Sequence, residues 1–316
     1  MSELFFDFGM GVSGDMLTGA LLDLFPDREQ VLRELNALAI PEVRYQARTM
    51  KQKGVSGLHV KVTVHGVEEG ANEKTVEVQA KHNKSGHEDS ESHQYGHGDS
   101  EPVGSGHGDT ESAESAHTHS HPHVSYRKLK EIVNGLELPE QVKNDVQQVY
   151  RILAEAEAEA HGVSMEDIHF HEVGTMDAIA DVTAAAYLMD RLGPDAIHAT
   201  PIHVGSGTVH CAHGILPVPA PATAIILKNI PYYRGNVQTE LCTPTGAALV
   251  RYFVQDFLLE EVPGEKFSKG AGEFSQSGCT GSREKIPSGG QIGRGFGSKV
   301  LSHCSAANCV AAVLVR

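Results

Sequence analysis

The chain has 316 residues, 40% of them hydrophobic, which is enough for a sizeable core in one large or two modest domains. Its 41 acidic residues outnumber its 26 basic residues, and the net charge of −15 argues against nucleic acid or an anionic membrane as a partner. We expect neither a membrane span nor a signal peptide, and five scattered cysteines favour a reducing cytoplasm. The unusual feature is 19 histidines, nine of them between His82 and His123, which points toward metals.

Residues 1–65 predict an N-terminal α/β unit. Apolar and alternating patterns give the strands, and helical periodicity gives the helices. The predicted elements are a strand over 4–8, helices over 16–24 and 27–38, and strands over 42–50 and 58–65. A glycine-rich loop separates the first strand from the first helix.

Residues 66–123 change character and consist mainly of Ser, Gly, His, Asp and Glu. Such a segment buries too little apolar surface to offset its chain entropy. We therefore predict a disordered insert rich in histidine and acidic residues.

Residues 124–274 return to alternating helical and extended patterns. The predicted helices are 126–136, 139–161, 175–192, 222–228 and 244–258, and the predicted strands are 168–173, 197–204 and 237–241. Strands that alternate with helices predict an α/β fold, with mixed α+β as the alternative. The expected molecule is a globular two-part fold interrupted by the insert.

Residues 275–316 are rich in Gly, Ser and basic residues and hold three of the five cysteines. They lack clear periodicity before residue 310. We therefore expect an irregular tail outside the core.

Four histidines near the end of the insert alternate with other residues: His117, His119, His121 and His123. In an extended chain this spacing puts the imidazoles on one side, where they can wrap around one cation. Neutral imidazole suits nickel, copper, zinc and cobalt. The alternative is a solvated linker whose histidines are incidental.

A second candidate metal site follows in His169, His171 and Glu172. The two imidazoles point the same way in a strand, and Asp177 and Asp181 follow at a spacing that shares one helix face. The alternative is a helix N-terminus whose acidic residues offset the helix dipole.

Two helix starts are candidate binding sites for an anionic ligand. The first contains Gly11, Ser13, Gly14 and Asp15, and the second contains Thr243, Thr245 and Gly246. The first loop matches neither common nucleotide-binding motif, and Asp15 suggests a metal or a ribose hydroxyl as its partner. Ordinary helix capping explains much of the second.

A weaker candidate is the loop that holds His203, His210, Cys211 and His213. Its spacing suits chelation of a metal ion, but a polar loop without a ligand explains it nearly as well.

Together these segments resemble the LarC nickel-insertion proteins. The resemblance rests on five features in order: DFGMGVSGDMLTGALLDL from Asp7, the His-rich insert, HFHEVGTMDAIADV from His169, HGILPVPAPAT from His213 and ELCTPTGAAL from Glu240. It implies a protein that places Ni(II) into pyridinium-3,5-bisthiocarboxylic acid mononucleotide. That product is the nickel-pincer cofactor of lactate racemase, and the family uses CTP in the step.

The resemblance stops near Gly272. Full-length relatives continue into a C-terminal domain to which CTP binding is attributed, so we expect a C-terminal partner polypeptide to supply it. We also hypothesise that residues after about 272 come from an alternative reading frame.

The implied reaction exchanges hydrated Ni(II) for two sulfurs and a ring carbon, and a proton must leave that carbon. Asp177, Asp181 and His213 are the candidate bases. His169, His171 and Glu172 are expected to present the ion. Two other functions stay open: a nickel store or chaperone without catalysis, and a metal-dependent phosphoester hydrolase.

Overall fold

The computed structural model describes residues 1–67, 124–170, 173–211, 213–259, 273–274, 286–298, 301, 304 and 306–316. The described residues belong to one compact unit. The predicted insert, apart from its first two residues, lies outside the described part of the chain.

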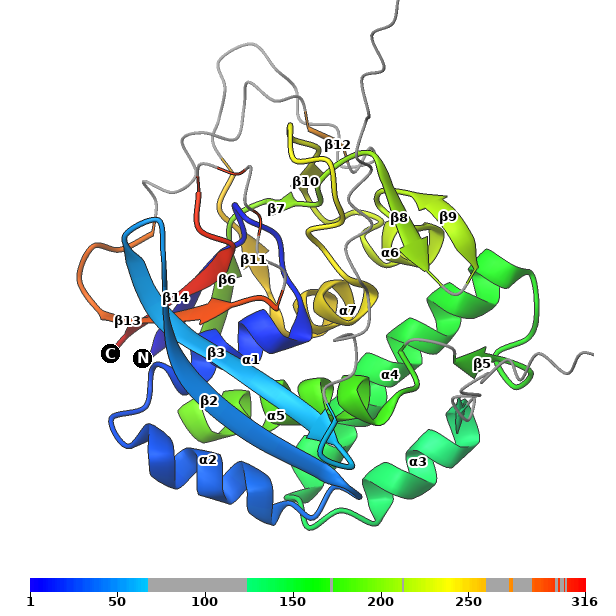
Figure 1. The fold of residues 1–316 in the computed structure, drawn as a ribbon, viewed down its shortest axis with the longest axis horizontal. Helices are drawn as coiled ribbons and strands as arrows, with labels where there is room; N and C mark the ends of the chain where they lie inside the picture. Colours follow the sequence, from blue (N-terminus) through cyan, green and yellow to red (C-terminus); the bar gives the residue numbers. More distant parts are fainter. Residues whose placement is uncertain are drawn as a thin grey trace, which may run out of the picture. The chain divides into compact units, whose positions relative to one another are not determined.

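A seven-stranded mixed sheet forms the centre of this unit (Figure 1). Its spatial order is β11 (Asp256–Phe257), β6 (Ala196–Ala199), β1 (Glu3–Asp7), β14 (Cys309–Val315), β13 (Gln291–Phe296), β3 (Val55–Val64) and β2 (Val43–Gln52). β1 runs parallel to β6 and antiparallel to β14. β13 is antiparallel to β14, and β2 is antiparallel to β3. The prediction of a mixed α/β fold is confirmed.

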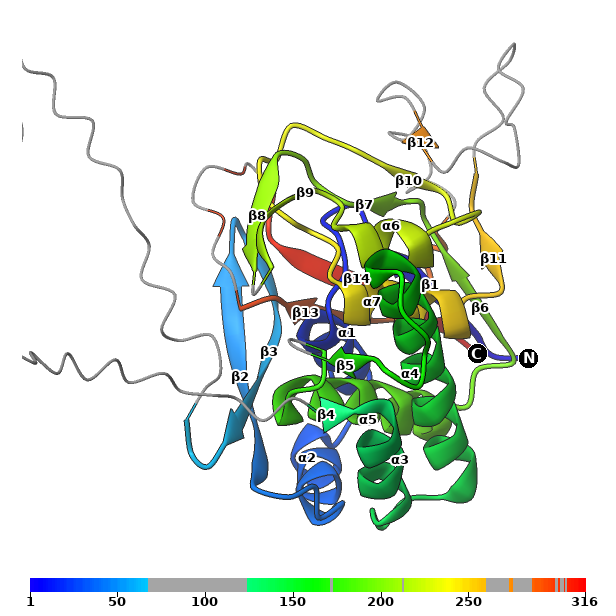
Figure 2. The same ribbon diagram turned by 90° about the vertical axis from the view of Figure 1, so that its right-hand side faces the viewer.

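Helices pack against the sheet, and further helices pack on these (Figure 2). They are α1 (Gly14–Leu22), α2 (Arg28–Ala37), α3 (Tyr126–Asn134), α4 (Glu140–His161), α5 (Met176–Leu192), α6 (Pro221–Ile226) and α7 (Pro244–Phe253). α1 packs against β13 and β3, α5 packs against α1, and α4 packs against α5. Small alanine side chains at the buried positions of α5 let it lie between its neighbours.

Short strands form the outer parts of the described fold. They are β4 (Val124–Ser125), β5 (His169–Phe170), β7 (Ile202–His203), β8 (Thr208–Cys211), β9 (Gly214–Pro217), β10 (Tyr232–Tyr233) and β12 (Glu273–Phe274). β8 and β9 make an antiparallel hairpin, and β10 lies between β7 and β12 in a small parallel sheet.

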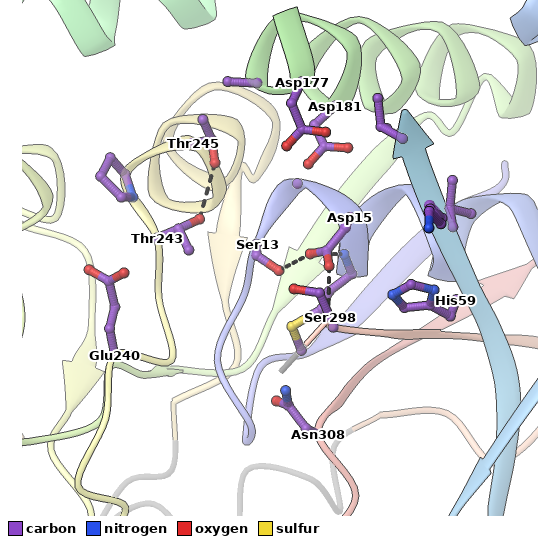
Figure 3. Close-up of a pocket in the computed structure, with 18 of the residues that line it drawn as sticks. Ser13, Asp15, His59, Asp177, Asp181, Glu240, Thr243, Thr245, Ser298 and Asn308 are labelled. Carbon is purple, nitrogen blue, oxygen red and sulfur yellow. Dashed lines mark hydrogen bonds between the residues drawn. The ribbon is translucent and has the colours of Figure 1, made fainter. Parts of the chain in front are cut away.

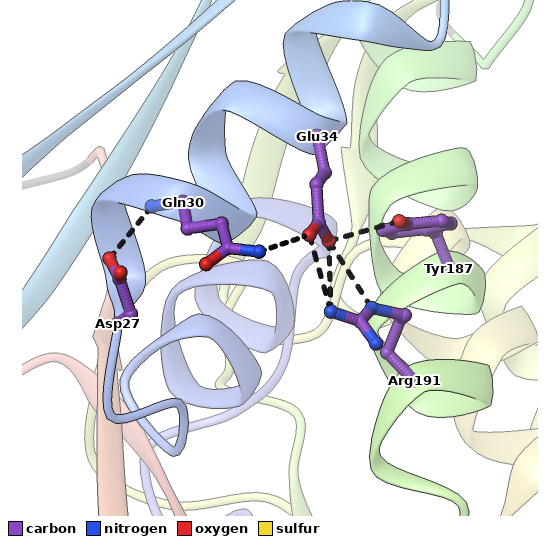
Figure 4. A network of polar contacts seen from close by, with 5 residues as sticks. All are labelled: Asp27, Gln30, Glu34, Tyr187 and Arg191. Atoms are coloured by element: carbon purple, nitrogen blue, oxygen red, sulfur yellow. Dashed lines mark hydrogen bonds and ion pairs between the residues drawn. The ribbon is translucent and has the colours of Figure 1, made fainter.

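A polar network joins α2 to α5 at the surface (Figure 4). The Glu34 carboxylate lies 3.0 Å from the Arg191 guanidinium and accepts a hydrogen bond of 3.1 Å from the Tyr187 hydroxyl. Because these groups are partly exposed, the network fixes helix orientation more than it adds stability.

Three predicted elements differ clearly from the structure. The predicted strand over 197–204 is divided into β6 and β7, which belong to different sheets. The predicted helix over 244–258 ends at Phe253, because Val254 adopts an extended backbone and the chain then enters β11. The predicted strand over 237–241 is absent. This segment instead bonds to two loops: Leu241 N–H donates to Val204, and its carbonyl accepts from Val12.

The expectation of an irregular tail is wrong for the described part of residues 275–316. β14 lies between β1 and β13 in the central sheet, and Val310, Ala312 and Leu314 are buried in the core. The sequence signal of β13 is weak because two of its six residues are glycines, Gly293 and Gly295, where α1 approaches closely. Whether these residues come from another reading frame stays a prediction.

No helix in the described ranges is long and apolar enough to cross a membrane.

Replacing Gly295 by alanine tests whether β13 is integral to the fold. A Cβ at Gly295 would lie 1.9 Å from the Met16 carbonyl oxygen of α1, so backbone would have to move. We expect G295A to lower the free energy of unfolding by about 1–3 kcal/mol, as overpacking does. Denaturant unfolding measures it.

Gly289→Ala is the matched control, because nothing lies within 4 Å of the Cβ position there. Equal stability of G295A and the wild type would contradict the close packing of β13 on α1.

Candidate functional site

Three helix N-termini meet around one pocket of about 290 Å³ (Figure 3). Ser13 precedes α1, Thr175 precedes α5 and Thr243 precedes α7, and all three line it. We call this cavity the junction pocket. Each helix presents the positive end of its dipole and the backbone N–H groups of its first turn there, which favours negative charge.

Direct backbone bonds hold the α1 and α7 loops together. Val12 N–H donates to Leu241 at 2.9 Å, and Thr243 N–H donates to Val12 at 3.1 Å. Gly11 has a φ of +84°, and a Cβ at Gly246 would lie 2.3 Å from the Val12 carbonyl oxygen. Neither glycine lines the pocket, so these two predicted ligand-binding residues instead permit the close approach of the loops.

Asp15 in the first turn of α1 contacts its own helix, the loop before that helix and the C-terminal segment. Its Oδ1 accepts from Met16 N–H at 2.8 Å and contacts the Ser13 hydroxyl. Its Oδ2 accepts from Ser298 N–H at 2.9 Å. The carboxylate therefore joins the α1 loop to the C-terminal segment while it also lines the pocket.

Asp177 and Asp181 of α5 line the same pocket, as their helical spacing predicts. A Cβ at Gly14 would lie 2.7 Å from Asp181 Oδ2, so the missing side chain makes room for the carboxyl group. The Asp15 backbone N–H favours the ionised form of this group. Asp181 Oδ1 is fully enclosed and accepts no hydrogen bond from any described residue.

Burial raises the pKa of Asp181 well above its usual range, and the nearby charges of Asp177 and Asp15 raise it further. The Asp15 N–H opposes this shift only in part. A carboxylate whose pKa is raised is a stronger base in its ionised form, so it can take up a proton from a bound molecule.

The α7 start contributes hydroxyl groups to the pocket. The Thr243 hydroxyl accepts from Gly246 N–H at 3.2 Å and lies 3.1 Å from the Thr245 hydroxyl. Thr243 therefore caps the helix, as the sequence predicts, and both threonines line the junction pocket.

Six further polar residues line the pocket that sequence reasoning did not assign to a site: His59, Lys61, Thr175, Glu240, Ser298 and Asn308. His59 and Lys61 lie on the same face of β3. The alternation of apolar residues that predicted this strand marks only its other face. Ser298 and Asn308 belong to the segment expected to be irregular, so no sequence signal placed them here. Glu240 directly precedes the predicted helix start, which was the one usable signal.

The predicted metal ligands are only partly described. His169 is exposed on β5 and does not line the junction pocket. His117, His119, His121 and His123, with His171 and Glu172, lie outside the described residues. Within the described ranges, no three His, Cys, Asp or Glu side chains are placed to hold a metal ion.

His213 lies in a neighbouring cavity of about 220 Å³ and not in the junction pocket. There it is close to His161, at the end of α4, with a ring-centre distance of 4.8 Å. The two cavities share Val173, Glu240 and Pro244 in their walls.

Comparison with known proteins gives consistent matches. The family model described as "Nickel insertion protein" matches residues 4–279. A pyridinium-3,5-bisthiocarboxylic acid mononucleotide nickel insertion protein of Desulfitobacterium hafniense (strain DSM 10664 / DCB-2) is 35% identical over 258 residues, covering 81% of this chain and 51% of the relative. A relative of the same name from Clostridium kluyveri is 38% identical over 261 residues, covering 81% and 54%.

This chain thus spans about half the length of the curated relatives that it matches. No solved structure matches it significantly.

The stability of an Asp181→Asn variant tests whether the pKa of Asp181 is raised in the folded state. It is measured in metal-free buffer with a chelator. Because the folded state holds the Asp181 proton more tightly than the unfolded state, this carboxyl group favours folding below the ordinary Asp pKa of about 4. The benefit is lost as pH rises through the raised pKa. As the pH rises from acid to neutral, we expect the free energy of unfolding of D181N to increase relative to that of the wild type by on the order of 1 kcal/mol or more.

Chemical denaturation across this pH range measures the difference. Asp190→Asn, at an exposed position of the same helix, is the control and should show no such trend. A D181N difference independent of pH would contradict the raised pKa.

Proposed function

The chain belongs to the nickel insertion protein family, and from its junction pocket we propose that it places Ni(II) into pyridinium-3,5-bisthiocarboxylic acid mononucleotide. One observation carries the proposal: Asp15, Asp177 and Asp181 share a cavity with three helix N-termini. Such a cavity offers negative groups to a cation and positive helix ends to an anion.

The proposed substrate has both kinds of charge. Its phosphate and thiocarboxyl groups are anionic, and its pyridinium ring is cationic. The start of α7, with Thr243 and Thr245, would bind the anionic groups through backbone N–H and hydroxyl donors. The carboxylates would attract Ni(II) and the ring. Carboxylate oxygen is a harder ligand than sulfur, so the ion can leave it for the substrate's sulfurs.

Formation of the carbon–nickel bond requires a base. The electron pair of the ring C–H bond passes to Ni(II), and the proton passes to a group of the protein. We assign this role to Asp181 in its ionised form, because it lines the pocket and its raised pKa makes the carboxylate a stronger base. Asp177 would then keep the cation beside it.

The remaining parts of the proposal come from the resemblance and from the length of the relatives. CTP would be used in the step, with its site in a C-terminal portion supplied by a partner polypeptide. Apo-lactate racemase would receive the product. His117, His119, His121 and His123, with His169, His171 and Glu172, would gather Ni(II) before its transfer. The free thiols of Cys211, Cys242 and Cys304 support a cytoplasmic location.

Reconstitution tests this function. The assay combines the chain, Ni(II), CTP, the dithio-ligand and a C-terminal portion from a relative, and it measures activation of apo-lactate racemase. We expect D181N to lower the rate on the order of 100-fold, as loss of a general base does, while its fold stays intact. D190N should keep the wild-type rate.

A wild-type rate for D181N would contradict the assignment of the base. Nickel retention without any cofactor formation would favour storage instead, and turnover of phosphoesters with metal alone would favour a hydrolase.

A further inference from the structure

A second cavity lies beside the junction pocket, lined by the end of α4 and by the β8–β9 hairpin. We call it the hairpin cavity. Its polar lining consists of Glu157, His161, Cys211, His213 and Glu240, and its other walls are mainly apolar. A ligand site is typically an apolar cavity in which a small number of polar groups converge.

The two imidazoles come from segments far apart in sequence. His161 ends α4, and His213 lies at the hairpin turn, where Cys211 pairs with Gly214. Their ring centres are 4.8 Å apart and their planes are tilted by 46°. Two imidazoles that bind one ion through nitrogen at about 2.1 Å have ring centres roughly 4.5 Å apart when they meet it at a right angle. The observed spacing therefore fits a shared ion.

The neighbouring groups suit a cation. Glu157 lies 3.5 Å from His161 within α4, and carboxylates beside a metal-binding imidazole orient it and raise its basicity. The Cys211 thiol also faces the cavity and donates to the Gly214 carbonyl at 3.5 Å. Imidazole with a nearby thiol favours borderline metals over magnesium or calcium.

We propose that His161 and His213 bind a borderline divalent metal ion in the hairpin cavity and that Glu240 passes this ion to the junction pocket. Two protein ligands leave most coordination positions to water, so the ion stays exchangeable. Glu240 lines both cavities and supplies a carboxylate on the path between them. That the ion is Ni(II), and that it moves onward, rests on the proposed function; the binding site does not.

The test uses the full chain with the nine histidines of residues 82–123 replaced by asparagine, so that the insert does not mask the site. Calorimetric titration with Ni(II) and the visible spectrum with Co(II) measure binding. We expect H161A and H213A each to weaken Ni(II) binding at least ten-fold and to change the Co(II) spectrum. Circular dichroism checks that each variant folds.

His210→Ala is the matched control. His210 lies between Val209 and Cys211, which both line the cavity, so strand alternation puts it on the opposite face. H210A should bind like the parent chain. Unchanged Ni(II) binding in H161A and H213A, or an equal loss in H210A, would overturn the site.

The transfer step has its own readout. At limiting Ni(II), H161A and Glu240→Gln should slow cofactor formation in the reconstitution, and excess Ni(II) should restore H161A. Cofactor formation at the parent rate in both variants would overturn the transfer route. Absence of cofactor formation in every chain would refute the proposed function, while the titrations would still decide the metal site.

Discussion

The account depends on one structural constraint: three helices must begin at the same point. Two backbone hydrogen bonds between the α1 and α7 loops fix that point, and Asp181 of α5 lies directly against Gly14 in the first turn of α1. The positive helix ends lower the cost of placing three aspartates together. They leave Asp181 with a strongly raised pKa, so the cost is not fully removed. A site that tolerates this repulsion is suited to a cation or a proton.

The C-terminal strands connect this constraint to the rest of the fold. β14 lies beside β1 in the central sheet, and Ser298, just after β13, donates to Asp15 in the junction pocket. The family match ends at residue 279, so this contribution comes from residues beyond the matched region. The site therefore belongs to the whole compact unit, and changes in β13 are expected to reach Asp15.

The sequence predicted most helices because their periodicity and caps are local features. Thr243 caps α7 as expected, and Asp177 and Asp181, predicted to share one helix face, line the same pocket. The sequence did not predict β13. The glycines of this strand are required by its close contact with α1, which is distant in the sequence. The pairing of His213 with His161 was missed for the same reason, since tertiary packing alone brings the hairpin to α4.

The central claim is that the junction pocket is where nickel and the dithio-ligand meet. Crystals of the chain grown with Ni(II) and this ligand, measured at the nickel absorption edge, test it most directly by anomalous scattering. The account predicts a nickel peak between the starts of α1, α5 and α7, next to Asp177 and Asp181. Ordered nickel and ligand at other positions, with this pocket filled only by water, would contradict it.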